Sequence, residues 1–193
     1  REPRTIEPSF VSRGGERELA MLLGKDLTFF DDEGRLQPGA AAALPKVQGS
    51  TVTWRLREAR WEDGRPVVSD DVKAGLALEQ SPDAATGNYE VAQKVTAFRR
   101  IDDRRFSMQF HKPYADFQAP DVHGIVPAHA PPDPKKNPLG HARQPLSRGP
   151  FRLARWNPGD RAEFTVNPHW VGPQPLLDRI VVRFFPDVTG LLQ

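Results

Sequence analysis

The sequence predicts a mixed α/β protein, of the α+β kind, that is built from two parts. Several segments alternate apolar and polar residues with the period of a strand, and turn residues such as Asp, Asn, Pro and Gly separate them. Few segments have the spacing of a helix, and neither an internal repeat nor a regular strand–helix–strand rhythm runs through the chain. These observations favour hairpins with short connections and few long helices.

The composition sets the size of the core and excludes several classes of protein. The 193 residues include 38% hydrophobic residues and four Trp, enough for one ordinary core or two small ones. No stretch approaches the roughly 20 apolar residues of a membrane helix, and the mean hydropathy is -0.58. The absence of cysteine excludes disulfides, thiolate metal sites and cysteine nucleophiles. The net charge of +2 is smaller than nucleic-acid-binding proteins usually carry, so no nucleic-acid partner is expected.

The first elements are expected before residue 60. Leucines at helical spacing predict a helix over residues 16–23 that ends at Gly24. Residues 27–30 follow as a short strand that enters a turn over residues 31–34, because its glycine supplies the positive φ of such turns. Strict alternation over residues 51–56 predicts a half-buried strand. Its apolar side chains share one face: Val52, Trp54 and Leu56.

The middle of the chain combines one helix with a hairpin. Ser69 is the expected cap of a helix over residues 70–78, and the two carboxylates that follow it suit the positive end of the helix dipole. Residues 95–101 and 105–110 are expected to pair as a β-hairpin, turning at Asp102 and Asp103. Three side chains of its second strand alternate on one face: Phe106, Met108 and Phe110.

The last third contains a second hairpin. Residues 127–138 hold five prolines and no periodicity, so we expect a loop or crossing segment there. A hairpin over residues 151–166 follows, with its turn at Pro158 and Gly159. A final strand is expected over residues 180–185. Asp187 resembles a helix cap with only six residues after it, so we expect the chain to be a piece of a longer protein.

Motifs that carry chemistry are missing. The sequence has no metalloprotease, nucleophile-elbow, dinucleotide-binding, phosphate-loop or calcium-loop pattern. Its five His residues do not pair at helical spacing, and its Asp–Asp pairs fall at turns or helix starts. Arg55, Arg57 and Arg60 lie near Trp54 and Trp61, but alternation and interrupting glutamates favour a solvated strand face over a nucleic-acid patch. We therefore expect no enzymatic activity, no metal and no cofactor.

A series of short segments, in the same order, resembles the oligopeptide- and dipeptide-binding family of ABC-transporter proteins, the family 5 extracellular solute-binding proteins. The most specific part is Thr-Trp-Arg-Leu-Arg at 53–57, followed by Trp-Glu-Asp-Gly-Arg-Pro-Val at 61–67 and Asp-Asp-Val at 70–72. The other matching segments are residues 2–8, 27–34, 36–41, 112–117, 124–127, 148–151, 156–160, 167–170 and 177–180. The chain departs from the family pattern at Ser147–Arg148–Gly149–Pro150, where Gly-Thr-Gly-Pro is usual, and at His169, where an acidic residue is common.

The resemblance implies the type II fold of periplasmic binding proteins, with two lobes that close on a solute about a hinge. Residues 1–24 and 128–193 would form a discontinuous and truncated first lobe. Residues 25–127 would form the extra subdomain typical of the peptide-binding members. The second lobe would be absent from this sequence.

The resemblance also implies ligand-binding residues. Ser12, Arg13 and Gly14 correspond to a segment whose backbone pairs with an extended peptide. Tyr89 corresponds to an aromatic residue of the subdomain that reaches the ligand. Two plainer roles stay open, because Arg13 fits a solvated loop and Tyr89 fits packing at the helix–hairpin junction. The expected core includes Trp54, Phe110 and Trp156.

The implied function is solute binding for an ABC importer. The protein would hold a peptide or a similar small solute in the periplasm or outside the cell and deliver it to an ABC transporter permease. It would meet the membrane only through that permease or a removed lipid anchor. The alternative is the ligand-sensing lobe of a regulatory protein built on the same fold, and a third is an enzyme on an unrelated fold. Half a cleft would bind solute weakly or not at all.

Overall fold

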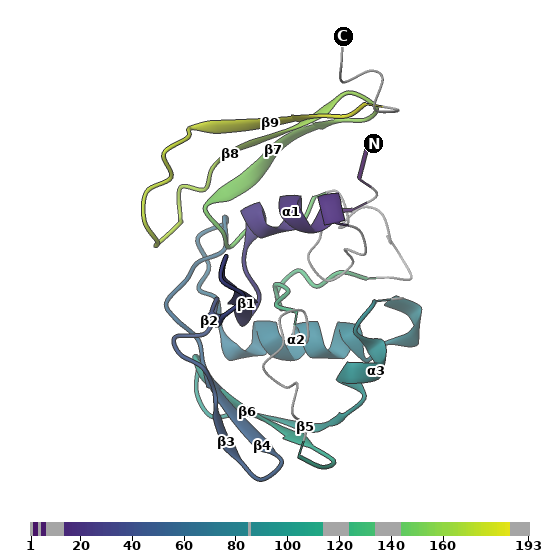
Figure 1. The fold of residues 1–193 in the computed structure, drawn as a ribbon, viewed down its shortest axis with the longest axis vertical. Coiled ribbons are helices and arrows are strands. Elements are labelled where there is room, and N and C mark those ends of the chain that lie inside the picture. Colours follow the sequence, from purple (N-terminus) through teal and green to yellow (C-terminus); the bar gives the residue numbers. More distant parts are fainter. Residues whose placement is uncertain are drawn as a thin grey trace.

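Two layered units lie one above the other along the long axis of the molecule (Figure 1). A computed structural model of the chain describes residues 2–3, 5–6, 14–84, 86–113, 124–133 and 144–185. One unit pairs a three-stranded sheet with helix α1, and the other pairs a four-stranded sheet with helix α2. All described strand pairs are antiparallel, so the structure confirms a mixed α/β fold with few helices.

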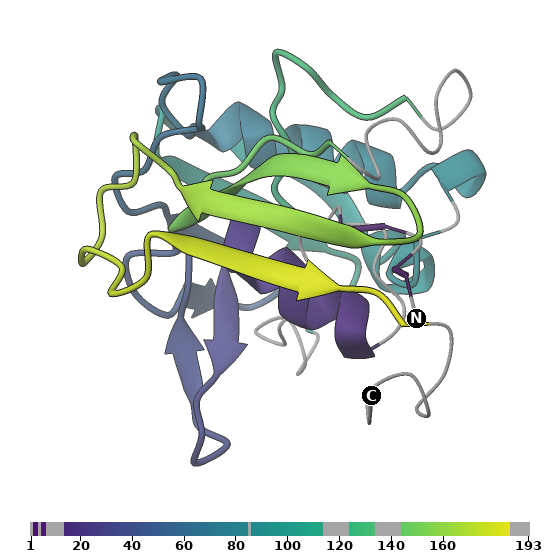
Figure 2. The same cartoon turned by 90° about the horizontal axis from the view of Figure 1, so that it is seen from above.

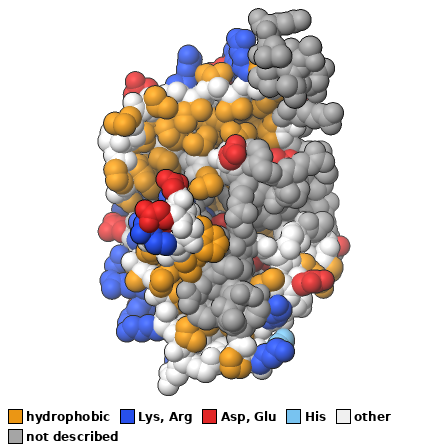
Figure 3. Space-filling view, viewed as in Figure 1, with side chains coloured by type: hydrophobic (Ala, Val, Ile, Leu, Met, Phe, Trp, Pro, Cys, Tyr) orange, Lys and Arg blue, Asp and Glu red, His pale blue; other side chains and the backbone are white. Residues whose placement is uncertain are grey.

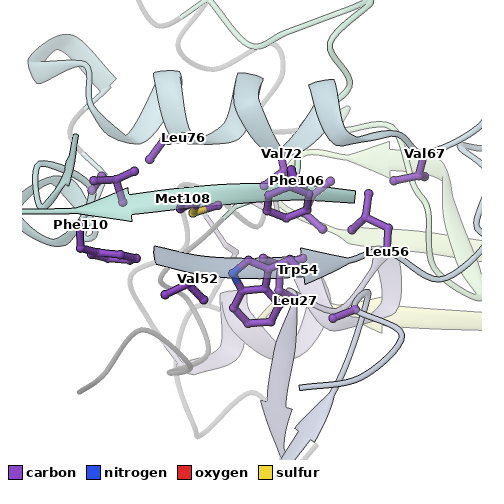
Figure 4. Packing of buried hydrophobic residues seen from close by; sticks show 14 of the residues in the cluster. Leu27, Val52, Trp54, Leu56, Val67, Val72, Leu76, Phe106, Met108 and Phe110 are labelled. Atoms are coloured by element: carbon purple, nitrogen blue, oxygen red, sulfur yellow. The ribbon is translucent and has the colours of Figure 1, made fainter. Parts of the chain in front are cut away.

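The four-stranded sheet has the order β3-β4-β6-β5. Alternation selects its buried face, because Val52 pairs with Met108, Trp54 pairs with Phe106, and all four side chains are buried. Helix α2 covers this face, and Figure 4 shows Val72 of the helix above Phe106. The predicted hairpin and the predicted face of residues 51–56 are therefore confirmed. The bounds of the strands are Lys46–Gln48 (β3), Thr51–Arg55 (β4), Val95–Arg100 (β5) and Arg105–Phe110 (β6).

Helix α2, Ser69–Glu79, begins differently from the prediction. Ser69 is its first residue rather than its cap, and the Ser69 hydroxyl donates to the backbone carbonyl of Asp102 over 2.9 Å. The side chain that caps the helix is Asp71, whose Oδ2 accepts the N–H of Val68 over 2.8 Å. The prediction that Ser69 caps the helix was wrong, because its hydroxyl bonds to the turn between β5 and β6 instead. Two short elements follow, the 3-10 helix η2 (Pro82–Ala84) and α3 (Tyr89–Ala92).

The three-stranded sheet has the order β7-β8-β9 and packs on α1. Figure 2 shows the sheet lying over this helix. Leu19, Leu22 and Leu23 of the helix join the apolar cluster beneath the sheet, as their spacing predicts. Gly159 has a φ of 75° in the turn between the first two strands. The bounds are Gly14–Leu23 (α1), Phe151–Asn157 (β7), Arg161–Val166 (β8) and Arg179–Arg183 (β9).

A two-stranded hairpin, β1 (Thr28–Phe30) and β2 (Leu36–Pro38), connects the units and projects from the body of the molecule (Figure 2). Asp31 orders its turn, because its Oδ1 accepts the backbone N–H groups of Glu33 and Arg35. Gly34 adopts a φ of 74° there. The predicted strand and turn over residues 27–34 are confirmed.

The buried hydrophobic residues separate into two main clusters. Every buried member of the first cluster lies between Leu27 and Ile125. The second cluster combines Ile6 and Leu23 with residues 151–184. Trp54 and Phe110 are buried in the first cluster, as predicted.

Trp156 differs from the prediction that it is a core residue. It is only partly buried at the edge of the second cluster, where its ring packs on Phe184 with the centroids 5.3 Å apart. Its Nε1 donates to Glu2 Oε1 over 2.9 Å, because an indole N–H needs a polar partner. Figure 3 shows hydrophobic side chains gathered on one face over the three-stranded sheet and α1.

The chain segments beyond these elements were also part of the prediction. The crossing segment shows no helix or strand over residues 127–133, as its prolines predict, and residues 134–138 lie outside the described residues. The expected helix at Asp187 lies outside them too. Within the described part of the chain, no helix has both the length and the apolar character needed to cross a membrane.

Candidate functional site

Of the four predicted ligand-binding residues, two fall within the described part of the chain. Ser12 and Arg13 lie outside the described residues. Gly14 is the first residue of α1, so its backbone lies at the helix end whose N–H groups have no partner within the helix. Tyr89 is the first residue of α3 and is 38% exposed. The start of α1 and helix α3 lie along the same flank of the molecule (Figures 1 and 2).

The two units are joined by a reciprocal pair of hydrogen bonds. The backbone N–H of Glu62 donates to the carbonyl of Ser147 over 2.7 Å, and the Ser147 N–H donates to Glu62 Oε2 over 2.8 Å. Glu62 belongs to the loop that follows β4, and Ser147 belongs to the segment that enters β7. Partial burial raises the pKa of the Glu62 carboxyl, against the opposing effect of the Ser147 N–H.

The segment at Ser147 also closes the end of α1. The carbonyl of Leu23 accepts the N–H of Arg148 over 2.9 Å and the Ser147 hydroxyl over 3.1 Å. Gly149 is required here, since a Cβ atom on it would lie 2.6 Å from the backbone nitrogen of Gly24 and from the carbonyl oxygen of Leu22. The end of α1 and the segment that enters β7 therefore touch through their backbones.

Residues 61–64 form a turn, and its side chains tie it to α2. Gly64 has a φ of 87°, and its N–H donates to the Trp61 carbonyl over 2.9 Å. The indole Nε1 of Trp61 donates to Asp71 Oδ2 over 3.0 Å, while Oδ1 of the same carboxylate accepts the N–H of Ala128 over 2.8 Å. One buried carboxylate thus joins the turn, the helix start and the crossing segment.

Two histidines lie against this turn. Nε2 of His129 is 2.8 Å from Asp63 Oδ2, and the ring of His169 lies over Gly64. Burial raises the pKa of Asp63, but the Arg65 N–H and His129 together bring it below its ordinary value. No group of three His, Cys, Asp or Glu side chains suited to a metal ion occurs among the residues that the structure describes.

The arginines near Trp54 and Trp61 do not form a stacking surface. Both indoles are buried, so bases have no access to them. The Arg57 guanidinium donates to the carbonyls of Ala41 and Pro38, and Arg60 donates to the carbonyl of Gly64. Arg55, the one of the three arginines that lies on β4, is exposed, which agrees with the interpretation of a solvated strand face.

Comparisons with known proteins agree with this architecture. Residues 35–193 match the family model of the middle part of the bacterial extracellular solute-binding proteins, family 5. Protein XP55 of Streptomyces lividans is 31% identical over 96% of this chain, which spans 34% of that protein.

Two solved structures share the fold over nearly the whole chain. The oligopeptide-binding protein AppA of Bacillus subtilis, in complex with a nonapeptide, matches 98% of the chain with a TM-score of 0.88 and 18% identity. NikZ of Campylobacter jejuni, in complex with Ni(L-His), matches 100% with a TM-score of 0.87 and 21% identity. The chain spans 39% of each of these two proteins.

Proposed function

Since the chain belongs to family 5 of the bacterial extracellular solute-binding proteins, we propose that it is part of the solute-binding component of an ABC importer. That component holds a peptide or a similar small solute outside the cytoplasm and delivers it to a membrane permease. It carries out no reaction on the solute. The observation that carries this proposal is the family match over residues 35–193.

The proposal divides the chain as the resemblance implied. Residues 1–24 and 128–193 belong to the first lobe, and residues 25–127 form an extra subdomain packed on it. The separation of the two hydrophobic clusters supports this division, because each cluster draws its buried residues from one side of these boundaries. The second lobe lies outside this sequence, in agreement with the 39% of AppA that the chain spans.

In this proposal the solute lies along the flank at which α1 begins. Ser12, Arg13 and Gly14 present backbone groups to an extended peptide, which explains a broad range of solutes because backbone pairing reads no side chains. Tyr89 contributes a partly exposed ring from the subdomain. Because one lobe buries less of a solute than the 70–90% typical of a closed pocket, this chain alone binds solutes weakly.

Titration calorimetry with peptide mixtures tests the proposal on the complete gene product that carries this chain. We expect the complete product to bind with a Kd of micromolar or below, and the 193-residue chain to bind far more weakly. Micromolar binding by the isolated chain, or none by the complete product, would contradict the proposal.

Substitutions test the proposed ligand-binding residues separately. Ser12→Pro removes one backbone donor and should weaken peptide binding about tenfold, and Tyr89→Ala should weaken it as well. Arg99→Ala, at an exposed position on β5, is the matched control and should leave affinity unchanged. If Ser12→Pro and Tyr89→Ala both retain full affinity with unchanged circular dichroism, the assignment of these residues is wrong.

A further inference from the structure

A pocket of about 330 Å³ opens where the two units meet, at the C-terminal end of α1. Its walls come from the end of α1, the base of the β1–β2 hairpin, the loop after β4, and the segments around Gly149 and Trp170. It lies apart from the proposed solute flank, because Gly24 in the pocket and Gly14 are separated by the length of α1, about 15 Å. Pockets at the junction of two units are a common place for small-molecule sites.

The charged side chains that line this pocket all carry the same sign. Lys25, Arg57 and Arg148 contribute three cations, and none of the described residues that line the pocket carries a carboxylate. Arg148 is only 6% exposed, and its Nη2 lies 4.0 Å from Oδ1 of Asp26, which is not among the lining residues. Arg57 is held in place by its hydrogen bonds to the carbonyls of Pro38 and Ala41. The lining therefore favours an anion.

Lys25 is the cation that an anion would engage most directly. Its Nζ lies 3.5 Å from the centroid of the Phe29 ring. Within the described part of the chain it forms no ion pair with a carboxylate. Burial and the neighbouring Arg57 lower the pKa of the Lys25 ammonium, against the opposing effect of Asp32.

The rest of the pocket is apolar and has a defined shape. Phe29, Trp170 and Met21 line it, and the Trp170 ring is fixed by a hydrogen bond from its Nε1 to the Pro173 carbonyl over 2.9 Å. Among its lining residues, Gly24 lies very close to the Arg148 side chain. A Cβ atom on Gly24 would lie 2.1 Å from Nη1 of Arg148.

We propose that this pocket binds a small organic carboxylate with an apolar, preferably aromatic body. The carboxylate lies between Lys25, Arg57 and Arg148, and the body lies against Phe29 and Trp170. The three cations come from separate segments of this chain, which the fold brings to one pocket. Since both units line the pocket, an occupant also braces the junction between them.

Calorimetry on the 193-residue chain tests the proposal with 3-phenylpropionate as the probe and its neutral amide as the matched control ligand. We expect the carboxylate to bind and to raise the unfolding temperature. The amide and inorganic phosphate should each bind at least about tenfold more weakly, because the first lacks the charge and the second lacks the apolar body. Equal binding of the amide or of phosphate, or no binding of the carboxylate at millimolar concentration, would overturn the proposal.

Substitution of Lys25 places the ligand in the pocket. Lys25→Met should weaken binding of the carboxylate at least about tenfold, and Lys25→Glu should weaken it further. Lys46→Met, which removes an exposed lysine on β3, should change nothing. Unchanged affinity in Lys25→Met and Lys25→Glu would overturn the assignment. This test uses no peptide and no second lobe, so its failure leaves the proposed transport function untouched.

Discussion

The indole Nε1 of Trp61 donates to Oδ2 of Asp71 over 3.0 Å, and both side chains are buried. The same carboxylate accepts the backbone N–H groups of Val68 and Ala128. A buried carboxylate is stable only when its oxygens are hydrogen-bonded, and here three donors satisfy it. Asp71 therefore has a structural role at the point where the turn, α2 and the crossing segment meet.

Replacing Asp71 should be far more harmful than replacing its neighbour. Asp71→Ala leaves three N–H donors without their acceptor, the buried indole N–H of Trp61 among them, and we expect a loss of about 3 kcal/mol in the free energy of unfolding. Asp70→Ala removes a half-exposed side chain with one ion pair to Arg100, and should cost less than about 1 kcal/mol. Urea unfolding of both variants measures the difference, and equal losses would refute the structural role of Asp71.

Gly149 should tolerate no side chain. In Gly149→Ala the new methyl group meets backbone atoms of Leu22, Leu23 and Gly24 at 2.6 Å, so α1 must move away from the segment that enters β7. We expect a loss of about 2 kcal/mol or more, by analogy with other overpacked sites. Gly87→Ala is the control, because nothing lies within 4 Å of its new methyl group and it should be neutral or slightly stabilising. Thermal unfolding distinguishes the two; similar unfolding temperatures would mean that the backbones do not touch.

Glu62 gives the junction between the units a dependence on pH. Its folded pKa is raised above the ordinary 4.5, so the folded state binds the proton more tightly than the unfolded state does. The contribution of Glu62 to stability therefore falls as the pH rises from about that value through the folded pKa. Glu62→Gln keeps an oxygen for the Ser147 N–H and removes the charge. Between pH 4 and pH 7, the free energy of unfolding of Glu62→Gln should rise relative to that of the wild type. Glu58→Gln, at an exposed position, should show no such relative rise. A parallel pH profile for wild type and Glu62→Gln would show that Glu62 is not responsible.

Asp102 should make the stability depend on pH in the opposite direction, because its contribution is lost as the pH falls. Hydrogen bonds from the Arg105 side chain and the Arg104 N–H lower its pKa to about 2, so its stabilising effect is complete above the ordinary value of 3.8. That effect is lost as the pH falls through about 2. Asp102→Asn should be less stable than the wild type at neutral pH and should approach it in stability near pH 2, as measured by urea unfolding. Asp103→Asn should keep the acid loss of the wild type, and failure to do so would remove the special role of Asp102.

The sequence was sufficient for elements whose own residues carry the pattern. The faces of β4 and β6 follow from alternation, since Trp54 and Phe106 each lie between polar neighbours. The turns at Gly34, Gly64 and Gly159 follow from the positive φ that glycine permits.

Elements that depend on distant partners were missed. All three residues of β3 are exposed, so pairing with β4 alone makes it a strand. Helix α3 has four residues, fewer than a helix needs to form by itself. The cap at Asp71 was missed because Ser69 matches the local pattern while its hydroxyl bonds to Asp102, 33 residues away.

The two proposed binding sites also differ in how far the sequence alone could predict them. Ser12, Arg13, Gly14 and Tyr89 came from a resemblance and remain a prediction. The cationic pocket joins Lys25, Arg57 and Arg148 from three separated segments, and no local spacing reveals such a meeting.

Native mass spectrometry of the complete gene product, isolated from its own cells, tests the central proposal most directly. If this chain forms part of a solute-binding protein, the product should carry a small molecule that dissociates unchanged, while the 193-residue chain carries no peptide. A complete product that is empty and stays empty after excess peptide is added, or one that releases the molecule chemically altered, would contradict the proposal.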